Sequence, residues 1–334
     1  MRKKIVIPGI IILLLAPLLY VAVTPWSELR PQDGYLEECP SEVFVKGAIV
    51  FDSLLICGTS EVDDAKIVHA ANVAAQWLDN DQDGVVDNPE INEKLKESKA
   101  VLLMSEKGFS SIFYLNFESV SEERGFFGQD LQDIETNNPT RRDATQEEIH
   151  HLIWGAGWAA VYPEVFDDKS SDSRIYSAWK YSDENQFYQY DDPTCDNYCK
   201  VMEHLYKSTA AFLNSSADLC DEEFTIKNSQ ELAEKHTLIV EVFESDEYNY
   251  PQTIWPDGNY LATSGIVYLG IDQVPEPVIK DNLNEICVQY EESLTFGQII
   301  IPLYYALLAI TAIFAFIKNK QNNNSMDSQK QSTD

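Results

Sequence analysis

Residues 79–90 read DNDQDGVVDNPE, and this stretch decides how the chain around it is expected to fold. Its acidic side chains recur at the spacing with which a short loop surrounds a hard cation, because carboxylate oxygens are the ligands that Ca²⁺ prefers. Gly84, at the sixth position, permits the sharp turn that such a loop requires. The predicted calcium ligands, with Val85 offering its backbone carbonyl, are Asp79, Asp81, Asp83, Val85, Asp87 and Glu90.

The same stretch resembles the loop of the EF-hand family at every ligand position. Apolar residues at helical spacing precede it and end at Trp77 and Leu78. Asn88 and Pro89 suit the N-cap and the first turn of a following helix. The resemblance implies a helix–loop–helix over residues 61–99. Because the sequence shows no second loop of this kind, we expect a structural calcium site rather than a paired sensor.

A second group of candidate ligands lies in residues 146–155, QEEIHHLIWG. Glu147 and Glu148 precede His151 by four and three residues, so a helix would place both carboxylates beside the imidazole. Carboxylate and imidazole together are a ligand set for zinc or iron. We predict that Glu148, His151 and Glu203 bind this metal. Glu147 is then the predicted catalytic base, acting on metal-bound water in a peptidase-like hydrolase.

The ordinary alternative stays open, because Glu–His pairs at this spacing are common on the solvated helix faces of an acidic chain. Further acids and histidines on predicted helices could complete the site. They are His204, Glu234 and His236.

A wider set of motifs resembles an uncharacterised family of secreted proteins that also carry an Asp-x-Asp-x-Asp-Gly loop upstream. The resemblance implies one composite domain over about residues 60–260 and no known activity. The motifs are Glu147-Glu148-x-x-His151, Tyr162-Pro163, Asp191-Asp192-Pro193-Thr194-Cys195-x-x-x-Cys199, Glu203 and Trp255-Pro256-Asp257-Gly258-Asn259-Tyr260.

Charge and hydropathy divide the 334 residues into parts. The chain has 24 Lys and Arg against 55 Asp and Glu, a net charge of −31, which argues against a nucleic-acid partner. Residues 1–23 are predicted to be a signal peptide or signal anchor with an apolar helix. Residues 299–317 are predicted to be a transmembrane helix, with 318–334 as a disordered cytosolic tail. Residues 24–298 would then be an extracellular or lumenal domain at a cell-surface or internal membrane.

The six cysteines all fall in this predicted external segment, which indicates a disulfide set in an oxidising compartment. Their pairing stays open, because six cysteines allow 15 connectivities. Asn214-Ser215-Ser216 is a glycosylation sequon, so we expect a glycoprotein.

Periodicity predicts an α+β domain that is richer in helix than in strand. The expected helices are 61–78, a short one ending near 99, 145–160, 196–213 and 228–245, and the clearest strands are 100–104 and 112–117. We predict a membrane-anchored calcium-binding protein with a structural, adhesion or recognition role. The metal-dependent hydrolase is the alternative, and no protein partner can be named.

Overall fold

The computed structural model describes residues 31–277, apart from residues 140, 191, 216 and 221. Within this part, a mixed five-stranded sheet has the strand order β4-β3-β2-β1-β5. β1 pairs antiparallel with β2 and β5, while β2–β3 and β3–β4 are parallel. The strands are β1 (Phe44–Val50), β2 (Leu54–Thr59), β3 (Ala100–Ser105), β4 (Phe127–Gln132) and β5 (Ile266–Leu269).

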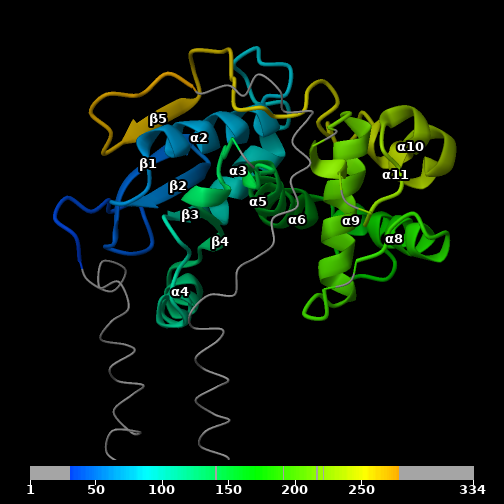
Figure 1. Ribbon diagram of the computed structural model, residues 1–334, viewed down its shortest axis with the longest axis horizontal. Helices are drawn as coiled ribbons and strands as arrows, with labels where there is room; N and C mark the ends of the chain where they lie inside the picture. The colour runs from blue at the N-terminus through cyan, green and yellow to red at the C-terminus, as the bar shows by residue number, and fades with distance from the viewer. Residues whose placement is uncertain (1–30, 140, 191, 216, 221, 278–334) are drawn as a thin grey trace, which may run out of the picture. The chain divides into compact units, whose positions relative to one another are not determined.

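Helix α2 (Asp64–Leu78) packs on β1 and β2, and its apolar residues form part of the main core. It leads into the loop, after which α3 (Pro89–Glu97) begins with Asn88 as N-cap and Pro89 in its first turn. Both predictions about the start of α3 are therefore confirmed. The loop is thus held between two helices on one side of the sheet (Figure 1).

The remaining helices lie mostly at the other end of the described domain (Figure 1). Helix α5 (Thr145–Ile153) connects the two ends, because it packs on β3, β4, α2 and α9. The other helical elements are α4 (Ser111–Arg124), η2 (Asp133–Glu135), the π-helix η3 (Trp154–Trp158), α6 (Ala159–Val161), α7 (Pro163–Phe166), α8 (Arg174–Glu184), α9 (Asn197–Phe212), η4 (Ala217–Leu219), α10 (Ser229–Lys235) and α11 (Thr237–Phe243).

Residues 248–261, which we name the strap, contain neither helix nor strand. They follow α11 and return across α2 toward β5, as the yellow-to-gold stretch in Figure 1 shows. The strap therefore links the helical end of the domain to the sheet.

Two of the expected elements differ from the structure. Residues 112–117 are part of α4 rather than a strand, because the Ser110 side chain caps the helix and Gly125 ends it at φ 76°. The expected helix 228–245 is two helices, since His236 adopts φ −135° between them.

The predicted architecture also needs a correction concerning membranes. Among the described residues, no helix is both long and apolar enough to cross a bilayer. The two apolar runs in question, 5–23 and 299–317, lie outside the described residues, as does the 318–334 tail. What the structure describes is an α+β domain with a mixed sheet, and anchoring by apolar helices is not supported.

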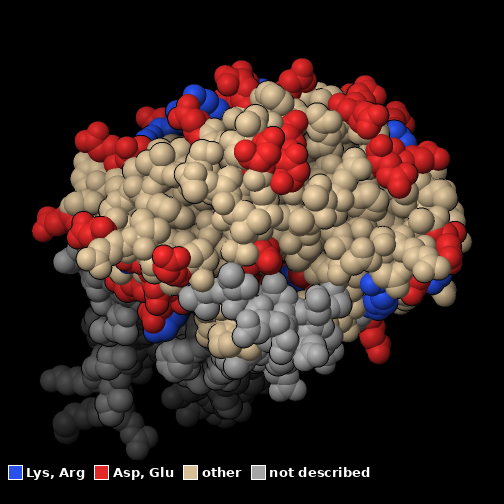
Figure 2. All heavy atoms as spheres, turned by 90° about the horizontal axis from the view of Figure 1, so that it is seen from above, with Lys and Arg blue, Asp and Glu red and all other residues tan. Residues whose placement is uncertain are grey.

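Within the described part of the chain, Cys39 is bonded to Cys57 and Cys195 to Cys199 as disulfides. Acidic side chains are spread over the face seen in Figure 2, where Lys and Arg are fewer. The described residues on that face therefore form no basic patch for a polyanion to bind.

Candidate metal centre

The start of α5 is fixed by a buried aspartate. The Asp143 carboxylate accepts hydrogen bonds from the backbone N–H and the hydroxyl of Thr145, at 3.1 and 2.6 Å, and Thr145 is the first residue of the helix. Its other oxygen lies 2.6 Å from Nε2 of His69 on α2. Burial disfavours the charge of Asp143, but His69 outweighs it and holds the pKa below its usual range. α2 and α5 are thereby joined at the base of the site.

Three side chains from α5 and α9 converge beyond the first residues of α5. Glu147, His151 and Glu203 each place one ligand atom within 4.8 Å of the other two. His151 and Glu203 are 4% and 8% exposed. Nε2 of His151 lies 3.8 Å from a carboxylate oxygen of Glu203 and, among the described residues, has no hydrogen-bond partner. Two ligands of one ion at about 2.1 Å each are separated by roughly 3–4 Å, so this gap suits a shared cation.

Glu147 is held in place from outside this group. Arg142 forms an ion pair with its carboxylate and lies 3.1 Å from Asp218. Asp218 in turn accepts a 2.6 Å hydrogen bond from Tyr206. Burial opposes the ionisation of Glu147, but Arg142 outweighs it and lowers the pKa of Glu147 to about 2. Glu147 is therefore a charged, oriented carboxylate at neutral pH.

The other two carboxyl groups behave in the opposite way. Glu148 accepts a 2.7 Å hydrogen bond from Gln129 on β4 and is not a member of the converging group. Burial and the charge of Glu147 raise the pKa of Glu148 to about 8 and that of Glu203 to about 9. Burial lowers the pKa of His151 to about 4, so its imidazole is neutral and able to bind a metal.

The remaining predicted histidines lie elsewhere. His204 and His236 contact each other, with their Nε2 atoms 3.2 Å apart, in a buried aromatic environment. Glu234 is exposed and accepts a hydrogen bond from Gln230. The structure thus brings together His151 and Glu203 with Glu147, rather than with Glu148, His236 or Glu234.

Residues 79–90, which we name the acidic loop, form a second converging group. Asp79, Asp81 and Asp87 place one carboxylate oxygen each within 4.8 Å of one another, whereas Asp83 and Glu90 are not members of this group. Backbone N–H groups of Asn80 and Gly84 donate to these carboxylates at 2.7 and 2.9 Å. Val85 is 63% exposed. Burial, followed by repulsion from Asp81, Asp79 and Asp83, raises the pKa of Asp87 to about 6.

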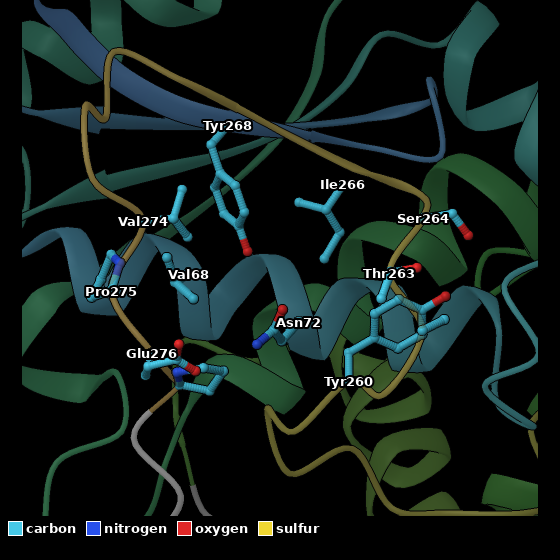
Figure 3. Close-up of a pocket in the computed structure, with 12 residues that line it drawn as sticks. Val68, Asn72, Tyr260, Thr263, Ser264, Ile266, Tyr268, Val274, Pro275 and Glu276 are labelled. Atoms are coloured by element: carbon cyan, nitrogen blue, oxygen red, sulfur yellow. The ribbon is translucent and has the colours of Figure 1, made fainter.

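A cavity of about 470 Å³ lies between α2 and the chain around β5. Tyr268 and Ile266 point toward α2, where Val68 and Asn72 lie (Figure 3). Its lining includes none of the residues of the two converging groups. The cavity is therefore separate from the carboxylate–imidazole chemistry.

Sequence reasoning missed the supporting residues Arg142, Asp218 and Gln129. Arg142 carried a usable signal, because Arg141-Arg142 is a pair of bases directly before a Glu-rich helix in an acidic chain. No comparable signal marks Gln129 or Asp218, which reach the site only through the fold.

Comparison with known proteins gives no match to a family model, to a curated protein or to a solved structure.

Proposed function

We propose that this protein is a metal-dependent hydrolase whose ion is bound by Glu147, His151 and Glu203. One observation carries the proposal: the buried Nε2 of His151 has no hydrogen-bond partner among the described residues and lies close to the carboxyl groups of Glu147 and Glu203. A buried polar atom without a hydrogen bond costs about 1–3 kcal/mol, so a cation at this position would remove that cost. One nitrogen and two oxygen ligands suit zinc or iron, and three protein ligands leave a position for water.

The arrangement exchanges the roles of two neighbouring glutamates. Glu147 is a ligand, and Glu148 is the proposed proton-transfer group. A bound divalent cation would lower the pKa of Glu148 from about 8, so that its carboxylate can take a proton from water. The water oxygen then bonds to the carbonyl carbon of an amide or ester. Glu148 passes the proton to the leaving group as the old bond breaks. A bound ion would supply Lewis-acid activation of the water and of the carbonyl.

The test separates metal binding from proton transfer. Zn²⁺ binding and the hydrolysis of casein, used as a general probe, are measured for the wild type, His151→Ala and Glu148→Gln. We expect His151→Ala to lose Zn²⁺ affinity by more than the about 10–100-fold typical of outer ligand partners. Glu148→Gln should keep Zn²⁺ and lose activity. Glu234→Gln, which removes an exposed acid, serves as the control and should change neither.

Equal Zn²⁺ affinity in the wild type and His151→Ala would contradict the proposed ligand set. Full activity in Glu148→Gln would contradict its proton-transfer role.

We also propose that residues 79–90 bind Ca²⁺ in a structural role, as the EF-hand-like sequence predicted. The approach of Asp79, Asp81 and Asp87 supports this, because three carboxylates this close repel one another without a cation. The full ligand set would add Asp83, the Val85 carbonyl and Glu90 as the loop closes on the ion. The Cys39–Cys57 and Cys195–Cys199 disulfides support a location in an oxidising compartment.

A further inference from the structure

The strap connects the two converging groups. It has no regular secondary structure, so side chains of its neighbours must fix its path. Its residues lie more than 150 positions from the acidic loop in the sequence, as their hydrogen bonds show. The contacts on its two sides are made by different elements.

On one side, the acidic loop holds the strap. Asn80 Oδ1 accepts the backbone N–H groups of Thr253 and Ile254 at 2.7 and 3.1 Å, and its Nδ2 donates to the Ile254 carbonyl at 2.9 Å. The Tyr260 hydroxyl donates to the Asp79 carboxylate, which is itself a member of the converging group. The loop and the strap therefore cannot move independently.

Loop contacts continue at both ends of the strap. Asn88 donates to the carbonyl of Tyr248 at 2.8 Å, and Asn249 donates to the carbonyl of Asp87 at 3.1 Å. At the far end, Gln82 accepts the N–H of Leu261 at 3.0 Å.

On the other side, the strap holds the two helices that carry the proposed metal ligands. The Tyr250 hydroxyl lies 2.7 Å from Nε2 of His150 on α5 and 2.7 Å from the hydroxyl of Thr209 on α9. Tyr250 is 2% exposed, so this bridge is buried. His150 is the neighbour of His151, and the bridge therefore bears directly on the spacing between α5 and α9.

Two further contacts reinforce this bridge. Gln146 at the start of α5 donates to the carbonyl of Pro256 at 3.1 Å. The Trp255 ring packs between Trp77 of α2 and Tyr206 of α9, at centroid distances of 5.4 and 5.7 Å.

We propose that the strap positions the ligands of the Glu147–His151–Glu203 site, and that Ca²⁺ thereby regulates the affinity of this site for its ion. Tyr250 fixes the spacing of α5 and α9. The acidic loop in turn fixes the path of the strap. The inference rests on the two ions proposed above. Without Ca²⁺, the repulsion among Asp79, Asp81 and Asp87 loosens the loop. The strap then loses its anchors, and the gap between His151 and Glu203 is no longer fixed.

The experiment measures Co²⁺ affinity of the full chain from the His151-dependent part of the visible Co²⁺ absorption, obtained by subtracting the signal of His151→Ala. Titrations are run with and without saturating Ca²⁺. We expect Ca²⁺ to tighten Co²⁺ binding about 10-fold, within the range of about 5–150-fold that coupled sites show. Coupling is reciprocal, so saturating Co²⁺ should tighten Ca²⁺ binding by the same factor.

Three variants locate the coupling. Asp81→Asn removes an exposed loop carboxylate and should bind Co²⁺ weakly whether or not Ca²⁺ is present. Tyr250→Phe keeps the ring and loses the bridging hydroxyl, so its Co²⁺ affinity with Ca²⁺ should fall by about 10-fold. Tyr248→Phe is the matched control, because its hydroxyl has no hydrogen bond to α5 or α9 in the described part of the chain. Tyr248→Phe should leave the Co²⁺ affinity unchanged. If Tyr250 served stability alone, Tyr250→Phe would lower Tm and leave the Co²⁺ affinity unchanged.

The outcomes distinguish a failure of the proposed metal site from a failure of the positioning role of the strap. If the wild type shows no Co²⁺ binding that depends on His151, the proposed hydrolase site fails and the inference fails with it. If Co²⁺ binds through His151 with equal affinity with and without Ca²⁺ and in Tyr250→Phe, the site stands and the positioning role of the strap is overturned.

Discussion

Glu147 and Glu148 are adjacent in the sequence, yet the fold gives them opposite acidity. Arg142 stabilises the charge of Glu147, whereas burial and the charge of Glu147 itself keep a proton on Glu148. Neighbouring carboxyl groups with pKa values moved apart are typical of sites that combine binding with proton transfer. The immediate neighbours of these two glutamates therefore decide which one is charged and which one holds a proton.

Raising the pH should destabilise the metal-free protein. The pKa values of Glu148 and Glu203, about 8 and about 9, lie above the ordinary 4.5 of an unfolded chain. The stability that their protons contribute is fully present below 4.5 and is lost as the pH rises through 8 and 9. Between pH 7 and 9 we expect the urea midpoint of unfolding to fall, and to fall less in Glu203→Gln. A midpoint that rises or stays constant over this window would contradict the protonated state.

Sequence spacing found His151 and Glu203 but could not separate Glu147 from Glu148. Both glutamates satisfy the i,i+3 or i,i+4 rule relative to His151, so a helix alone brings either one close. Arg142 and Gln129 decide between them by fixing one carboxylate in the group and the other outside it. Gln129 belongs to β4 and reaches α5 only through tertiary packing, which no local pattern reveals.

Helix caps decide whether an ambiguous segment forms a helix or a strand, and where a helix begins. The apolar run in residues 112–117 was short enough to fit a strand or a helix. The Ser110 cap and the left-handed Gly125 settle it as α4. By contrast, Asn88 and Pro89 gave a reliable start for α3, since capping is local in sequence.

Asn88→Ala should affect both stability and calcium binding. Asn88 accepts the N–H groups of Glu90 and Ile91 as the N-cap, and it also donates to the strap at Tyr248. We expect the free energy of unfolding to fall by about 1–2 kcal/mol, together with weaker Ca²⁺ binding, measured by urea titration and calorimetry.

Ser173→Ala is the matched control for this cap. Ser173 caps α8 by accepting the N–H of Tyr176 and takes no part in the strap contacts described above. Its loss should lower stability by a similar amount with no change in Ca²⁺ affinity. Equal Ca²⁺ affinities in the two variants would show that the contact of Asn88 with the strap has no influence on the loop.

Across the described domain, the strap ties the acidic loop to helices α5 and α9 and leads on to strand β5 of the sheet. The α+β class and most helices followed from periodicity, but the strap could not be predicted. Its hydrogen bonds join residues such as Asn80 and Ile254, which are 174 positions apart. The expected membrane helices are not part of what the structure describes, and the two apolar runs lie outside it.

Calcium should stabilise the entire described domain, because the loop is bonded to the strap and the strap to α5 and α9. A ligand at 100 times its Kd contributes about 2.7 kcal/mol. For a domain of this size we expect Tm to rise by roughly 5–10 °C in saturating Ca²⁺. Asp79→Ala should show no rise. The same rise in this variant would place the calcium effect outside residues 79–90.

The metal content of the purified full chain is the sharpest test of whether Glu147, His151 and Glu203 bind a transition metal. Mass spectrometry of the wild type should find zinc or iron at one ion per chain in addition to calcium. His151→Ala should lose the zinc or iron and keep the same calcium content. A wild type without stoichiometric zinc or iron, or a His151→Ala variant that retains either metal, would show that these three side chains do not bind it.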